Sequence, residues 1–250
     1  MSHSDLNHKI NVDAIASSSK SLYKIAGIAV LISVLLMLLD IVTTIISEEA
    51  IQFGAFTSTD WFAIYQNNWF SGLRNLGFLN ILEMTLAVPM FFAVYTAHKD
   101  GSKTYTALAM ILSFIGLAIY ISNNAAVPMF VLSNKYAAAT TETQRFMLAA
   151  AGEALLAKGE DFSPGAFMGF FLGEIANLTL AFIMLRGRIF GKVTAYTGII
   201  GISFLTVYTV WVTFIPALQG AAMILAMIGG PLATVWSILI ARRLFQLAGS

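Results

Sequence analysis

Residues 22–46, LYKIAGIAVLISVLLMLLDIVTTII, decide the fold of this chain. From Ile25 onward, Asp40 is the only charged residue in this stretch. A helix needs about 20 apolar residues to cross the hydrocarbon core of a bilayer, so the stretch predicts a membrane-spanning helix. It is too long for the apolar region of a signal peptide and lacks a convincing small-residue cleavage site. We therefore expect it to remain in the protein as its own insertion signal.

Five further apolar segments are long enough to span, namely residues 73–97, 105–122, 164–185, 193–215 and 221–244. The outer end of the third is ambiguous, because apolar residues resume after Asn123 and Asn124 and continue through Phe130. The pattern predicts an all-α fold, a polytopic membrane helix bundle with six transmembrane helices. Residues 22–250 would form one transmembrane domain, and the polar residues 1–21 a disordered cytoplasmic tail.

The composition restricts the class of protein. Hydrophobic residues make up 58% of the 250 and charged residues only 11%, whereas soluble domains contain about 25% charged residues. A net charge of +1 offers no basic surface for a nucleic-acid partner. The absence of cysteine excludes disulfides, thiolate metal sites and a cysteine nucleophile.

The distribution of basic residues predicts the orientation, because cytoplasmic loops are enriched in Lys and Arg. Ten lie in one set of loops: Lys9, Lys20, Lys24, Lys99, Lys103, Arg186, Arg188, Lys192, Arg242 and Arg243. Four lie in the other set: Arg74, Lys135, Arg145 and Lys158. Acidic residues favour this second side, among them Glu48, Glu49, Asp60, Glu142, Glu153, Glu160 and Asp161. Both termini are therefore expected in the cytoplasm of a multi-pass protein of the cell (inner) membrane.

Two amphipathic helices are expected on the outer surface. Asp60 is suited to cap a short helix rich in aromatic residues, which would be an interfacial anchor or a lid packed on the bundle. Residues 141–144, TETQ, have the form of a capping box and precede apolar residues at helical spacing. Glu153 and the short apolar length argue against a seventh span there, so we expect a helix lying on the outer surface. The outer link between the last two spans is short, from about Pro216 to Gly220.

Three carboxylates lie inside predicted spans: Asp40, Glu83 and Glu174. Ionised groups at membrane depth cost a few kcal/mol each, so they face a polar interior, hold a proton, or both. Asn80 precedes Glu83 by three residues and Asn177 follows Glu174 by three, which places each pair on one helix face.

Further polar residues lie toward the outer helix ends. Asn123 and Asn124 mark the end of the third span, and Arg74, a potential counter-ion, lies at the mouth of the second. Together with the carboxylates and their amides, these residues suggest a polar pocket that opens outward and binds a small solute, cation or proton. The alternative is a set of neutral acids and amides that hydrogen-bond between helices, each bond contributing about 0.6 kcal/mol.

Gly165, Gly169 and Gly173 repeat every four residues in the fourth span. Such a stripe lets another helix approach closely. Packing inside the bundle is the favoured interpretation, ahead of a helix–helix contact with a second protein.

Several chemistries are missing from the spans. His3, His8 and His98 lie outside them, and the one lysine within a predicted span, Lys24, lies at its very start. The chain has no H-E-x-x-H, P-loop or G-x-S-x-G motif. No cofactor and no metal site are therefore expected, although the three carboxylates leave a hard-cation site open.

Three short segments resemble a bacterial family of multi-pass membrane proteins, domain of unknown function 4386. They are residues 23–27, YKIAG, residues 133–137, SNKYA, and the turn from Arg186 to Gly191. The resemblance would cover nearly the whole chain from residue 22 and implies a prokaryotic membrane protein. It implies no activity and no catalytic residues.

The sequence leaves three functions open. The leading hypothesis is a non-enzymatic protein of the lipid bilayer that binds or moves a small solute or ion. The second is an intramembrane enzyme that uses its carboxylates on a lipid-like substrate. The third is a structural or accessory subunit that contacts a partner helix through its glycine stripe.

Overall fold

The computed structural model describes residues 3–46, 56–98, 101–215, 217 and 219–249, and these ranges contain helices and no strand. The helices are α1 (His3–Ile46), α2 (Ser58–Asn67), α3 (Trp69–Asn75), α4 (Phe78–Ala97), α5 (Lys103–Asn123), α6 (Ala126–Ala138), α7 (Glu142–Gly159), α8 (Pro164–Gly187), α9 (Lys192–Phe214) and α10 (Gln219–Gly249). Glu48, Glu49, Lys99 and Pro216, on which some predictions rest, lie outside the described residues.

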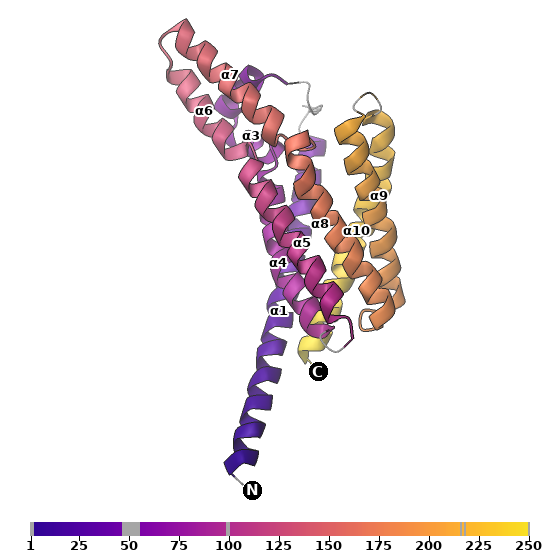
Figure 1. Cartoon of the computed structure of the whole chain (residues 1–250). Helices are drawn as coiled ribbons and strands as arrows, with labels where there is room; N and C mark the ends of the chain where they lie inside the picture. Colours follow the sequence, from indigo (N-terminus) through magenta and orange to yellow (C-terminus); the bar gives the residue numbers. More distant parts are fainter. Residues whose placement is uncertain (1–2, 47–55, 99–100, 216, 218, 250) are drawn as a thin grey trace.

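Six candidate spans are long and apolar enough to cross a membrane, and they lie in α1, α4, α5 with α6, α7 with α8, α9, and α10. The predicted all-α bundle with six spans is therefore confirmed. Neighbouring spans pack in the order α1–α4–α5–α8–α9–α10, and α10 returns to α1. The six helices thus form a ring in which both ends of the chain lie at the same end of the bundle (Figure 1).

The ring packs around an apolar core that includes Phe91, Leu180, Met184 and Ile240, all almost completely buried. Its outside is also apolar. Leu35 is 64% exposed and Met227 71% exposed, and many other large apolar side chains are exposed on the spans. A soluble monomer exposes apolar patches of only a few hundred Å², so this surface is suited to lipid.

Residues 3–21, the described part of the segment predicted to be a disordered tail, are helical. Helix α1 begins at His3 and continues without a break into the first span (Figure 1). Nucleation is the costly step in helix formation, so a segment joined to a stable span can extend its helix with a smaller penalty.

The second span begins later than predicted. Residues 73–75 belong to the separate helix α3, and α4 begins only at Phe78. Gly77 lies between them with φ +82°, in the left-handed region that favours glycine. This residue breaks the helix that hydropathy alone would run through residues 73–97.

Four helices rather than two lie beyond the ring at the end opposite the C-terminus: α2, α3, α6 and α7 (Figure 1). Asp60 is not the cap of α2. The cap is Thr57, and Asp60 is the third residue of the helix, whose side chain completes the capping box. The predicted cap at Thr141 is present, since its side chain accepts a hydrogen bond from the Gln144 amide.

The aromatic residues of α2 are packed on protein. Trp61, Phe62 and Tyr65 are buried against α6 and α7. The backbone N–H of Ser58 donates to Glu153 of α7 at 2.6 Å. Of the two predictions for this segment, the structure therefore supports the packed lid, whereas Trp69 of α3 remains 58% exposed.

The helix predicted after residues 141–144 is present as α7. Helices α6 and α7 pair as a hairpin that extends α5 and α8 away from the ring (Figure 1). The helical run after α5 breaks at Asn124 and Ala125 and resumes at Ala126. We call this end of the molecule the hairpin end, and the end with the C-terminus the terminal end.

The glycine stripe of α8 contacts α5 at its centre. A Cβ on Gly169 would lie 2.7 Å from the Cβ of Tyr120, and one on Gly116 would lie 2.8 Å from the Gly169 carbonyl oxygen. Gly165 meets the Lys158 backbone instead, and Gly173 has only a distant neighbour in Met84. The middle of the stripe therefore serves packing within the chain, as the sequence favoured.

Candidate functional site

The eight residues predicted to form one outward pocket are divided among separate places in the structure. Glu83 and Asn177 line one cavity. Asp40 pairs with Arg74, and Asn80 and Asn124 join a buried network at the hairpin end. Glu174 bonds to α9, and Asn123 donates to the Gly165 carbonyl. The single outward pocket expected from the sequence is thus not formed.

The cavity that contains Glu83 lies between α1, α4, α8 and α10, on the inside of the helix ring. Its volume is about 200 Å³, several times the roughly 30 Å³ that one water molecule occupies in the liquid. It is lined by Val30, Ser33, Glu83, Met84, Leu86, Ala87, Met90, Asn177, Trp236 and Ser237. We call it the Glu83 cavity.

Some polar side chains of the Glu83 cavity lack hydrogen-bond partners among the described residues. Glu83 makes no hydrogen bond or ion pair with any residue that the structure describes. The side-chain oxygen of Asn177 is buried and likewise has no hydrogen-bond partner there. Ser237 donates its hydroxyl proton to the Ala233 carbonyl at 3.0 Å, which leaves the hydroxyl oxygen as an acceptor. The cavity therefore presents the oxygens of Glu83, Asn177 and Ser237 as acceptors. Its lining also contains the indole of Trp236, whose N–H has no partner among the described residues.

These oxygens define what the cavity can hold. An unpaired carboxylate in a low-dielectric interior is costly unless it is protonated or meets a cation. Carboxylate, amide and hydroxyl oxygens are ligands for hard cations and acceptors for protonated amines. Glu83 is the one carboxylate among the described residues that line the cavity, so the arrangement suits a singly charged ligand.

Arg74 and Asp40 form an ion pair beside this region. Their side chains are 3.8 Å apart, from Nη1 to Oδ1, and the same Nη1 donates to the Thr43 hydroxyl at 2.6 Å. The arginine side chain is 4% exposed and the aspartate 42%. The predicted counter-ion role of Arg74 is therefore realised at Asp40. Asp40 in turn lies close enough to Glu83 for the two carboxyl groups to interact electrostatically.

A buried polar network closes the hairpin end of the ring. Asp161, in the link between α7 and α8, accepts hydrogen bonds from Tyr120 at 2.5 Å and from Asn80 at 2.8 Å. Asn124 donates to the Leu76 carbonyl at 2.9 Å. We call this set the hairpin-end network. It joins α4, α5 and the α7–α8 link, so it is a structural junction rather than an open pocket.

Two residues of this network were not among the predicted site residues. Asp161 was assigned to an exposed outer loop and Tyr120 to the apolar run of a span, yet both are buried. The sequence alone gives no local signal for these two residues. They meet the Gly77 backbone, Asn80 and Asn124 only when the helices pack together. Phe162, the residue after Asp161, has φ +61° and stacks on Phe170.

Glu174 is held by α9. Its Oε1 accepts a 2.6 Å hydrogen bond from Thr209, while its Oε2 is buried without a partner among the described residues. It does not line the Glu83 cavity, although Asn177 on the next turn does. Glu83 and Glu174 therefore form a matched pair for experiments, one acid at the cavity and one outside it.

Comparison of the chain with protein-family models, curated proteins and solved structures finds no match.

Proposed function

We propose that this chain is a membrane protein that binds a small, singly charged cation or protonated solute at the Glu83 cavity and moves it or a proton across the membrane. One observation carries the proposal: an unpaired carboxylate and an unpartnered amide oxygen line the same internal cavity within the spans. Buried polar groups in proteins are nearly always hydrogen-bonded, so two unsatisfied groups at one cavity indicate a missing partner.

The chemistry of the cavity favours binding over catalysis. Its lining contains no histidine, lysine or threonine, and its only hydroxyl groups belong to Ser33 and Ser237. Neither serine has a histidine or lysine beside it in the lining to act as a general base. The cavity therefore supports a binding or transport role better than hydrolysis of a lipid-like substrate.

The membrane and the orientation are part of the proposal. Ten basic residues against four support cytoplasmic termini, which would put the terminal end in the cytoplasm and the α6–α7 hairpin outside. The resemblance to domain of unknown function 4386 supports a bacterial inner membrane. With this orientation, the hairpin-end network would close the outer side of the ring.

Flux measurements in liposomes test the proposal. Purified protein should conduct protons, or a monovalent cation such as sodium or methylammonium, under an imposed gradient. Glu83→Gln should lower the flux to the level of empty vesicles. Glu174→Gln is the matched control, because it removes a second acid within the spans that does not line the cavity, and it should retain most of the flux. Equal loss in both variants would refute a specific role for the Glu83 cavity.

A further inference from the structure

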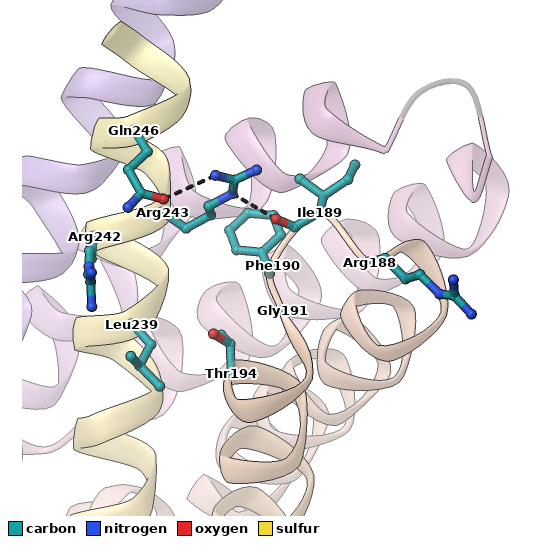
Figure 2. Close-up of a pocket in the computed structure, with 9 residues that line it drawn as sticks. All are labelled: Arg188, Ile189, Phe190, Gly191, Thr194, Leu239, Arg242, Arg243 and Gln246. Atoms are coloured by element: carbon teal, nitrogen blue, oxygen red, sulfur yellow. Dashed lines mark hydrogen bonds between the residues drawn. The ribbon is translucent and has the colours of Figure 1, made fainter. Parts of the chain in front are cut away.

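The terminal end of the bundle contains a basic cleft between α10 and the turn that joins α8 to α9 (Figure 2). Its volume is about 410 Å³, twice that of the Glu83 cavity. It is lined by Arg188, Ile189, Phe190, Gly191, Thr194, Leu239, Arg242, Arg243 and Gln246. The proposed cation site does not use any of these residues.

The arginines of α10 supply the charge of the cleft. Arg243 donates from Nε to the Ile189 carbonyl at 2.7 Å and from Nη1 to Gln246 at 3.0 Å, which holds its guanidinium across the cleft (Figure 2). Its Nη2 makes no hydrogen bond to a described residue. Arg242 is exposed and is not engaged in an ion pair within the described chain. Arg188 is directed away from α10 (Figure 2).

Within the part of the chain that the structure describes, the arginines of the cleft make no ion pair with an acidic side chain. Residues 175–250 contain no Asp or Glu, whereas they contain Arg186, Arg188, Lys192, Arg242 and Arg243. The α8–α9 turn and α10 therefore contribute only positive side-chain charge. Such a region attracts an anion, and guanidinium groups bind phosphate through several hydrogen bonds.

An apolar groove continues from the basic cleft along the lipid-facing side of α1 and α10. It is lined by Leu31, Ile238, Arg242, Phe245 and Gln246, so it shares two residues with the cleft. Its volume is about 510 Å³. Phe245 packs over Gly27 of α1, where a Cβ would lie 3.0 Å from the ring. The groove thus offers an apolar surface directly beside the arginines.

We infer that the basic cleft and this groove form a binding site for an anionic phospholipid. The phosphate of the headgroup would take the open donors of Arg242 and Arg243, and one acyl chain would lie over Leu31, Ile238 and Phe245. A soluble anion would use the arginines but not the groove. Basic pockets between spans are suited to anionic headgroups, and here the charge and the apolar surface meet at Arg242.

Lipid retention by the purified full-length protein tests this inference. The protein would be mixed with phosphatidylglycerol or phosphatidylcholine, and bound lipid measured by native mass spectrometry. The wild type should retain phosphatidylglycerol preferentially. Each basic residue near a membrane surface contributes about fivefold to anionic lipid binding, so Arg242→Gln should lower retention about fivefold. Lys103→Gln, at the same end of the bundle and outside the cleft, should leave retention unchanged.

Two further variants separate the headgroup contact from general folding effects. Arg243→Lys keeps the charge but loses the planar fork of five donors, which lets Arg243 donate to Ile189 from Nε and to a phosphate from its terminal nitrogen atoms. This variant should therefore also lower retention while the protein remains folded. Phe245→Ala should lower retention of phosphatidylglycerol but leave binding of inorganic phosphate unchanged. Equal retention of the two lipids by the wild type would overturn the inference. So would unchanged retention in Arg242→Gln, or binding of inorganic phosphate without lipid preference.

Discussion

The hydroxyl group of Tyr120 donates a 2.5 Å hydrogen bond to Oδ1 of Asp161, and both side chains are buried. The bond joins the end of α5 to the link between α7 and α8. Asn80 of α4 donates to the other carboxyl oxygen at 2.8 Å. These two hydrogen bonds attach the hairpin to the helix ring. The bond from Asn80 also determines which face of α4 points toward the Glu83 cavity.

Removal of the Tyr120 hydroxyl should destabilise the fold. Tyr120→Phe leaves Asp161 with one fewer donor in a buried place, which costs about 1–3 kcal/mol. The measurement is the free energy of unfolding by denaturant in detergent micelles. Tyr105→Phe is the control, since Tyr105 is 62% exposed. Equal stability of the two variants would show that the short hydrogen bond contributes little.

Gly77 should not tolerate a side chain. Its φ of +82° is strained for other residues, and a Cβ would meet the Tyr120 hydroxyl and lie 2.5 Å from Oδ1 of Asp161. Backbone strain of this kind costs about 1–3 kcal/mol before any clash, so Gly77→Ala should lower the thermal midpoint. Gly101→Ala, whose Cβ would meet nothing within 4 Å, should leave it near the wild-type value. A normal midpoint for Gly77→Ala would contradict the described geometry.

The Arg74–Asp40 pair should respond unequally to removal of its two members. Arg74→Gln removes a buried cation together with its hydrogen bonds to Thr43 and α1. We expect the free energy of unfolding to fall by about 1.5–3 kcal/mol. Asp40→Asn should cost less, because its side chain is 42% exposed. A double-variant cycle of unfolding free energies measures the coupling. A larger effect for Asp40→Asn than for Arg74→Gln would oppose this assignment.

His98 should make stability depend on pH. Burial against Phe190 lowers the pKa of His98, while its hydrogen bond with the Val94 carbonyl acts weakly in the opposite direction. The folded protein then binds fewer protons than the unfolded chain, so stability falls as the pH drops below about 6.5, the ordinary histidine pKa.

The thermal midpoint of the wild type should therefore fall between pH 7.5 and 5.5 by more than that of His98→Gln, which cannot titrate. Other groups titrate equally in both proteins, so the difference between them reports His98. Parallel pH profiles would mean that burial does not shift the pKa of this histidine.

Hydropathy predicted the six spans because the bilayer requires long apolar segments, and such segments can be recognised directly in the sequence. It missed the break at Gly77, because a glycine between apolar residues does not reveal its backbone angle. Periodicity placed Asn80 with Glu83 and Glu174 with Asn177 on shared faces, but it does not determine which face turns toward which neighbour. In the structure, Asn80 donates to Asp161 and Glu174 accepts from Thr209, whereas Glu83 and Asn177 line the same cavity.

Chemical labelling of Glu83 tests the central proposal most directly. An apolar carbodiimide reacts with protonated carboxyl groups within a membrane, and mass spectrometry of peptides locates the adduct. We expect labelling at Glu83 that decreases as the concentration of a bound monovalent cation or protonated amine rises, with no such protection at Glu174. Labelling of Glu83 that no cation of this class reduces, or equal protection at both residues, would contradict a ligand site at the Glu83 cavity.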